Sequence, residues 1–188
     1  MSEPIRATAG LFVTATDTGV GKTYVTALIA RELKKAGRVV GAYKPVCSGA
    51  EADSKGQPLW RDVDTLTAAI GGQFDSHRVC PLRLKAPLAP NVAARCEQVE
   101  IDFDRICDAA RWWQGRVEIL LVEGVGGWLC PLTERQTIAD LAVALGFPLL
   151  VVARLGLGTI NHTLLTVYAA RSRGLTVAGI LLNEAEPL

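Results

Sequence analysis

Five short, mainly apolar segments recur along the chain. They are LFVTAT (11–16), VVGAYK (39–44), VEILLVE (117–123), PLLVVA (148–153) and LTVAGILLN (175–183). Near-continuous runs of aliphatic and β-branched residues, rather than strict alternation with polar ones, are typical of strands that are covered on both faces. The pattern predicts the strands of a buried, mainly parallel sheet.

Segments with helical spacing of apolar residues alternate with these strands. They span residues 22–36, 103–114, 137–145 and 159–173, and a glycine suited to a helix C-terminus follows the first, third and fourth. Repeated strand–helix–strand units predict a three-layer α/β/α fold with right-handed crossovers. Residues 47–100 are less regular, and only short helices near 62–70 and 90–95 are expected there. No linker or repeat divides the chain, so we expect one domain over residues 1–188.

Composition and charge narrow the classes of function. Lys and Arg number 20 against 19 Asp and Glu, so the charge balance favours neither nucleic acid nor an anionic membrane as a partner. The longest apolar run, FPLLVVA, is too short to span a bilayer, and the N-terminus does not resemble a signal peptide. The five cysteines show no C-x-x-C spacing, which predicts reduced, mostly buried thiols in a cytoplasmic protein.

The segment TATDTGVGKT (14–23) predicts a phosphate-binding loop between a strand and a helix. Gly19 and Gly21 allow the backbone to approach a phosphate, Lys22 can reach its outer oxygens, and the Thr23 hydroxyl can bind Mg²⁺. Thr16 stands where the usual G-x-x-x-x-G-K-[ST] pattern has its first glycine. That position closes the strand, where a β-branched residue is tolerated, so we expect the loop to function without the glycine.

Two further charged residues end predicted strands. Glu123 closes an apolar run before a glycine-rich loop, which favours a role in binding Mg²⁺ over that of an ordinary strand-end acid. Lys44 ends the second strand, on the edge of the sheet where Lys22 is also expected. It either joins the phosphate site or extends into solvent as a surface lysine. Asp62 and Asp64 are both suited to the first turn of a helix.

Six motifs give the chain a resemblance to the dethiobiotin synthetases. They are VTATDTGVGKT, GAYKPVCSG, VDTL, APLAPNVAA, VEGVGGWLCPL and GLGTINHTLLT, in that order between residues 11 and 183. The resemblance implies a homodimeric P-loop NTPase-like enzyme that uses ATP and Mg²⁺. It joins CO₂, or bicarbonate as its source, to 7,8-diaminononanoate as a carbamate, phosphorylates the carbamate and closes a cyclic urea. It also implies that family members continue beyond position 188 with a further strand and helix, which this chain does not include.

The same resemblance implies roles for individual residues. Binding of the nucleotide is expected from Thr18, Gly19, Val20, Gly21, Lys22, Thr23 and, at the adenine, Asn183. Binding of Mg²⁺ is expected from Thr23, Asp64 and Glu123. Catalysis is expected from Lys22 and Lys44 with hydrogen bonds from Thr18 and Ser48. Binding of the substrate is expected from Lys44, Ser48, Gly126, Gly127 and, from the partner subunit, Asn161. Two positions depart from the family pattern: Ala15 replaces a glycine and Asn91 replaces a frequent histidine.

Three other functions remain open from the sequence. A dimeric ATPase switch of the partitioning or septum-placement type shares this kind of loop, but it carries a lysine where this chain has Asp17. An amidase relative would require a second domain, for which this chain has no room. A plain nucleotide-binding module would leave Lys44 and the VEGVGGW segment without a role.

Overall fold

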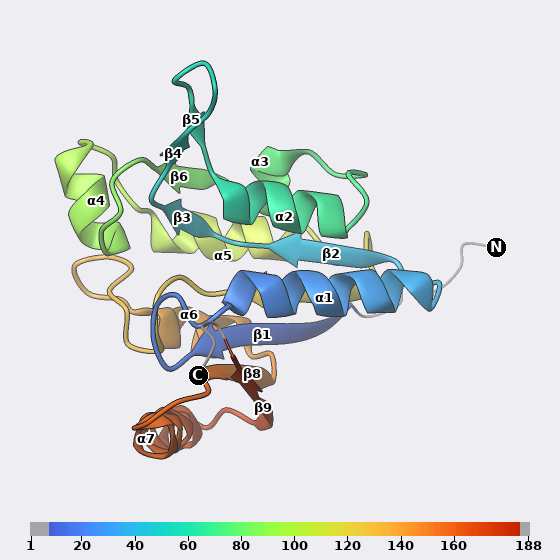
Figure 1. Ribbon diagram of the computed structural model, residues 1–188. Coiled ribbons are helices and arrows are strands. Elements are labelled where there is room, and N and C mark those ends of the chain that lie inside the picture. The colour runs from blue at the N-terminus through green and yellow to red at the C-terminus, as the bar shows by residue number, and fades with distance from the viewer. Residues whose placement is uncertain (1–7, 185–188) are drawn as a thin grey trace.

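A computed structural model describes residues 8–184, which form a five-stranded parallel sheet with the order β2-β7-β1-β8-β9 (Figure 1). The strands are β1 (Ala9–Ala15), β2 (Val40–Tyr43), β7 (Ile119–Glu123), β8 (Leu149–Arg154) and β9 (Val177–Asn183). All five predicted strands are confirmed, although their ends shift by one or two residues. Phe12 and Val13, which are neighbours in β1 and face opposite sides of the sheet, are both fully buried, as a strand covered on two faces requires.

Helices cover both faces of this sheet, which confirms the α/β/α prediction. On one face, Val25 of α1 (Lys22–Lys35) packs in a cluster with Val13 and Val152. On the other lie α6 (Ile138–Leu145) and α7 (Thr159–Ser172). In Figure 1, α1 lies in front of the strands, with α6 and α5 (Phe103–Arg111) behind them. The helix α5 is shorter than predicted, because residues 112–116 continue as turns. None of the helices in residues 8–184 combines the length and apolar character needed to cross a membrane.

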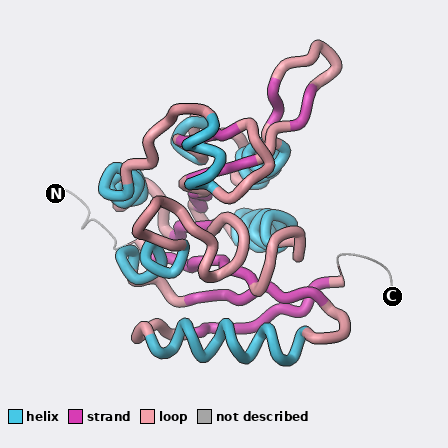
Figure 2. Tube along the Cα trace, turned by 90° about the vertical axis from the view of Figure 1, so that its left-hand side faces the viewer, coloured by secondary structure: helices cyan, strands magenta, loops and turns pink. Residues whose placement is uncertain are grey.

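The less regular region contains more structure than its sequence indicates. The predicted helices are present as α2 (Arg61–Ala69) and α4 (Pro90–Cys96). The sequence did not predict the two-stranded parallel sheet of β3 (Val46–Ser48) and β6 (Leu82–Leu84), the hairpin of β4 (Glu51–Ala52) and β5 (Pro58–Leu59), or α3 (Ser76–Val79). Elements of two to four residues are too short to show a period. The β4–β5 hairpin projects from the body of the domain in both views (Figures 1 and 2).

The register of the parallel strands positions the chemistry at one edge of the sheet. Tyr43 in β2 pairs with Val122 in β7, so the next residues, Lys44 and Glu123, lie side by side where the two strands end. Pro45 follows directly and the chain leaves the sheet. On the other side of β7, Val13 of β1 pairs with Glu123, and β1 leads into the phosphate loop. Three segments that are distant in sequence therefore converge at the carboxyl ends of neighbouring strands.

A close contact between β2 and the turn after α5 depends on a glycine. The ring of Trp113 is fully buried, and it lies over Gly41 so closely that a Cβ atom built there would be 2.6 Å from the ring. A side chain at position 41 would therefore displace the largest fully buried side chain of the core.

We expect Gly41→Ala to lower the free energy of unfolding by about 1–3 kcal/mol, as overpacking of a close-packed core does. Chemical denaturation monitored by circular dichroism measures this change. Gly156→Ala is the matched control: a Cβ there meets nothing within 4 Å, so a change within about 0.5 kcal/mol is expected. Equal stability of the two variants would show that the Trp113 contact is not tight.

Candidate active site

The phosphate loop has the backbone conformation that its glycines allow. Gly19 and Gly21 both adopt positive φ, at 73° and 93°, where other residues are strained. Gly21 has a second reason to be glycine: a Cβ atom there would be 2.2 Å from the side-chain nitrogen of Asn183. Thr16 needs no such freedom, because its N–H donates to the carbonyl of Val152 at 3.1 Å and so extends the parallel ladder. The missing glycine falls on the residue directly after β1, which is still hydrogen-bonded to β8.

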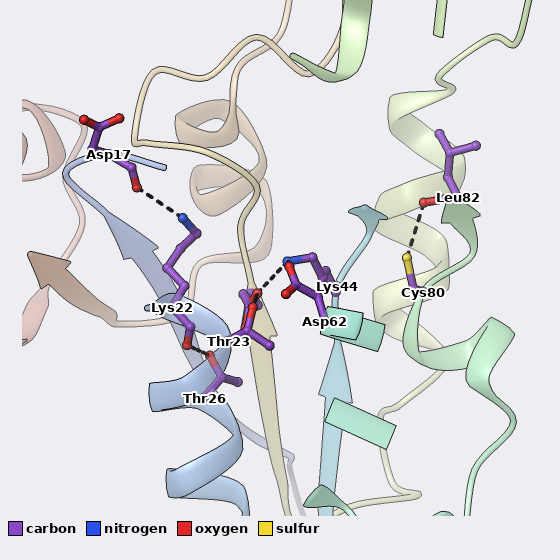
Figure 3. A network of polar contacts seen from close by, with 9 residues as sticks. Asp17, Lys22, Thr23, Thr26, Lys44, Asp62, Cys80 and Leu82 are labelled. Carbon is purple, nitrogen blue, oxygen red and sulfur yellow. Dashed lines mark hydrogen bonds and ion pairs between the residues drawn. The ribbon is translucent and has the colours of Figure 1, made fainter. Parts of the chain in front are cut away.

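Lys22 begins α1 with its side chain directed back over the loop. Its ammonium donates to the carbonyl of Asp17 at 3.3 Å (Figure 3), and the residue is only 7% exposed. Burial lowers the pKa of Lys22, and the positive charge of Lys44 lowers it further, against the opposing effect of Glu123. A neighbouring anion, such as a phosphate, would relieve both unfavourable effects.

Lys44 is the centre of an ionic network that is buried at Lys44 and Glu123 and half-buried at Asp62. Its ammonium lies 2.6 Å from Oε1 of Glu123 and 2.6 Å from Oδ2 of Asp62. The hydroxyl of Thr23 donates to the same Glu123 oxygen at 2.6 Å. Glu123 is fully buried and Lys44 is 3% exposed. Figure 3 shows the side chains of Thr23, Lys44 and Asp62 converging from α1, the end of β2 and α2.

The charges in this network stabilise one another. Burial alone would lower the pKa of Lys44, but the carboxylates of Glu123 and Asp62 outweigh burial and raise it above its usual value. Burial likewise opposes ionisation of Asp62, but Lys44, Thr23 and Lys22 outweigh that effect and lower the pKa of Asp62. Lys44 and Asp62 are therefore both charged at neutral pH.

A pocket of about 210 Å³ opens above the phosphate loop. It is lined by Thr18, Gly19, Gly21, Lys22, Thr23, Lys44, Ser48, Asp62, Val125 and Gly126. Most of the predicted site residues thus lie around one cavity, and both lysines are among them. A larger groove of about 570 Å³ lies between α4 and residues 132–136, and neither lysine lines it.

Three predicted residues support the pocket from behind. Val20 is 2% exposed in the cluster beneath α1, and its carbonyl accepts a hydrogen bond from the side-chain amide of Asn183 at 3.0 Å. Gly127 packs against the strand end, where a Cβ atom would lie 3.3 Å from the carbonyl oxygen of Thr16. These contacts hold the loop in place. The adenine role of Asn183 and the substrate role of Gly127 stay predictions.

The structure corrects the prediction for the acid on α2. Asp62 lines the pocket and binds Lys44, whereas Asp64 is exposed and lies outside it. Two residues along a helix differ by about 200° in direction, so the two side chains cannot face the same site. The sequence carried a signal for this choice that the motif comparison missed. Asp62 shares a helix face with Leu66 and Ala69, which are buried.

Asn161 also lies outside the pocket. It is exposed in the first turn of α7. Its expected contact, from the partner subunit, with the substrate stays a prediction. The five cysteines are all free; Cys47, Cys80 and Cys107 are buried, as expected for most of them.

The donor set around Glu123 fits a magnesium ion shared with nucleotide phosphates. Oε2 of Glu123 is buried and has no hydrogen-bond partner within residues 8–184. The Thr23 hydroxyl lies beside both Glu123 and Asp62. No group of three or more His, Cys, Asp or Glu residues in the described chain could hold a metal alone. Mg²⁺ is usually bound by one or two carboxylates together with substrate phosphates, which matches this arrangement.

Comparison with known proteins agrees with this geometry. A family model described as an AAA domain matches residues 9–187. Among solved structures, the kinase domain of the Escherichia coli tyrosine kinase ETK has a TM-score of 0.56 and 18% identity, covering 98% of this chain and 69% of that one. At this identity the likeness shows the fold alone. Fold and loop together define a P-loop nucleotide-binding protein.

Curated relatives define the family more closely. A protein of Anaeromyxobacter sp. (strain Fw109-5) named ATP-dependent dethiobiotin synthetase BioD is 51% identical over 176 residues, which cover 94% of this chain and 77% of the relative. A protein of the same name from Anaeromyxobacter dehalogenans (strain 2CP-C) is 51% identical over 178 residues, covering 95% and 78%. The chain belongs to the dethiobiotin synthetase family, as its motifs predicted.

The lowered pKa of Asp62 predicts how stability depends on pH. A group whose pKa is lower in the folded state stabilises the fold above its unfolded pKa, and this stabilisation is lost as the pH falls through the folded value. We therefore expect Asp62→Asn to destabilise the protein at pH 7, and the difference from wild type to shrink below about pH 4. Denaturant titrations between pH 7 and pH 2.5 measure both. Asp64→Asn should cost less at pH 7, and an equal cost would contradict the assignment of Asp62 to the network.

Proposed function

We propose that this protein uses ATP to convert 7,8-diaminononanoate and CO₂ into dethiobiotin, with release of ADP and phosphate. The observation that carries the proposal is the presence of a second buried lysine, Lys44, in the same pocket as the phosphate-loop Lys22. A nucleotide-binding loop needs only one of these cations. The second suits an additional anion beside the γ-phosphate, and a carbamate is such an anion. Relatives named for this activity support the choice of substrate.

The proposed reaction has three steps. One amine of the substrate attacks CO₂ and loses a proton, which gives a carbamate. A carbamate oxygen attacks the γ-phosphorus of ATP, the bond to ADP breaks, and a carbamic-phosphoric anhydride forms. The second amine attacks the anhydride carbonyl, loses a proton and expels phosphate, which closes the five-membered urea.

The side chains of the pocket divide these tasks by position. Lys22 and the loop amides from Thr18 to Thr23 are placed to hold the β- and γ-phosphates. Lys44 and Ser48, which line the same pocket with Thr18 and Gly126, are suited to the carbamate. Phosphoryl transfer depends mainly on positioned cations that neutralise charge as it develops, so two converging lysines supply the main requirement.

Thr23, Glu123 and Asp62 would hold Mg²⁺ with the phosphates of ATP. When bound, the metal neutralises charge on the transferring phosphoryl group. Asp62 replaces Asp64 in this proposal, because its side chain reaches the pocket. Asn183 at the end of β9 is proposed to contact the adenine, and Gly127 to allow close approach of the substrate.

An exposed apolar face on α7 supports a homodimer. Ile160, Leu164 and Tyr168 lie one helical turn apart and are 75%, 50% and 70% exposed. Leu165 of the same helix and Leu157, in the turn before it, are also exposed. A second copy covering this face would bring Asn161, in the first turn of α7, near the subunit boundary, where its amide and the helix N-terminus suit a substrate carboxylate. A cytoplasmic location without nucleic-acid or membrane partners stays a prediction.

We expect ADP release by the purified protein to require the diamine, bicarbonate and Mg²⁺ together. A coupled ADP assay with each component omitted in turn measures this. Lys22→Met should lower kcat by about 10²–10³-fold, as loss of one preorganised charge contact does. Lys35→Met removes an exposed lysine that pairs with Glu32, and it should leave turnover unchanged. ATP hydrolysis that responds to DNA or lipid rather than to the diamine would favour the switch ATPase instead.

Placing a charge on the apolar face of α7 should separate the subunits. Leu164→Asp is expected to convert a dimer into a monomer in sedimentation velocity experiments, because an unpaired carboxylate would be buried in the interface. Arg31→Asp, on the exposed side of α1, is the control and should leave the mass unchanged. A Leu164→Asp protein that remained dimeric would place the interface elsewhere.

A further inference from the structure

The ammonium of Lys44 contacts both carboxylates that are proposed to bind the divalent cation. It contacts Glu123 and Asp62, the two carboxylates that fit Mg²⁺, at 2.6 Å each. The contacted Glu123 oxygen, Oε1, also accepts the hydrogen bond from Thr23. The other oxygen of Glu123 is buried without a hydrogen-bond partner in the described structure. Lys44 therefore neutralises the same acids that the proposed function assigns to the metal.

We propose that Lys44 and the divalent cation compete for Asp62 and Glu123, so that arrival of the metal frees the Lys44 ammonium to face the substrate. This inference rests on the proposed function for the identity of the site. It adds a property of the site itself: Lys44 is held away from its substrate position until the metal is present. We call this arrangement the Lys44 latch.

The burial of Glu123 supplies the driving force. A fully buried carboxylate without a counter-ion is strongly destabilising, so some cation must remain beside it. Among the described residues Lys44 is the lysine in direct contact with Glu123, because the Lys22 ammonium contacts the Asp17 carbonyl instead and acts on the two acids only at longer range. A divalent cation on the same oxygens would replace this neutralisation and repel an ammonium held there.

The backbone at Lys44 is held in place, so a response to the metal is limited to movement of the Lys44 side chain. The Lys44 N–H donates to the carbonyl of Val79 at 2.7 Å, and the preceding residue, Tyr43, is paired in the sheet and fully buried. The main chain at position 44 is thus fixed, whereas the lysine side chain is a flexible chain of four carbons. Because Lys44 and Ser48 both line the pocket, rotation of this stem can move the ammonium toward the site proposed for the carbamate.

The two lysines provide a matched pair for testing competition against simple charge repulsion. Each contributes one positive charge to the same pocket, and each is less than a tenth exposed. Only Lys44 contacts the carboxylates. Loss of either charge removes repulsion of a metal, but only loss of Lys44 removes a group that must be displaced.

The first experiment measures binding of Mn²⁺ alone, without nucleotide, by electron paramagnetic resonance. Lys44→Met is expected to tighten binding by about 5- to 150-fold, the usual range of coupling between two sites, and Lys22→Met by much less. Equal tightening in the two variants would show general charge repulsion and would overturn the latch. Weaker binding in Lys44→Met would mean that Lys44 supports the metal instead of competing with it.

The second experiment uses the wild-type chain and is independent of how well Lys44→Met folds. An amine-reactive reagent is applied over a Mg²⁺ titration, and modification of each lysine is followed by mass spectrometry. Labelling of Lys44 should rise as Mg²⁺ is added, and its midpoint should equal the midpoint of metal binding. Labelling of the exposed Lys35 should stay constant. Lys44 labelling that does not change across the titration would overturn the proposal, since Asp62 alone would then have moved.

Neither measurement contains the diamine or bicarbonate. The latch can therefore fail while diamine-dependent ADP release succeeds, in which case the proposed function stands with a Lys44 that does not compete with the metal. If the latch is observed and ADP release shows no dependence on the diamine, the site couples metal to lysine for another anionic substrate.

Discussion

A carboxylate with no solvent exposure at the end of β7 is the constraint on which the rest of the site depends. A buried carboxylate is strongly destabilising without a cation beside it, and the register of β2 against β7 places Lys44 at the side of Glu123. Thr23 adds a hydrogen bond from the first turn of α1, and Asp62 binds the same lysine from α2. One buried charge thus connects two strands and two helices, and it sets where both a metal and a substrate anion can bind.

The phosphate loop shows how local and distant contacts combine. Its glycines adopt conformations that their sequence positions require, but the loop is also held by Asn183, whose amide binds the Val20 carbonyl from the edge strand β9. Thr16 takes part in the strand ladder, so the loop proper begins one residue later. The departure from the usual motif therefore falls on a residue fixed by β8, while Gly19 and Gly21 keep the positive φ angles of the loop.

Much of the candidate site could be predicted from the sequence because parallel strands end at a common edge. Lys22, Lys44 and Glu123 each follow or close an apolar segment, and the topology brings such positions together. The choice between Asp62 and Asp64 could not be made from motif spacing, because both are acids in one helical turn and only the direction of α2 separates them. The strand β3 was missed because pairing with the distant β6, rather than local pattern, defines it, and the hairpin strands β4 and β5 are too short to show a period.

The sequence by itself determined the order of strands and helices, the nucleotide-binding loop and the family, because these follow from periodicity and from residues that are neighbours in the chain. The tertiary structure alone decided that Lys44 is neutralised by an acid 79 positions away and that one face of α7 stays uncovered. Pairing of this kind depends on strand register and helix direction, which are set by packing of the whole core. A pattern of single residues along the chain does not contain the strand register or the helix direction.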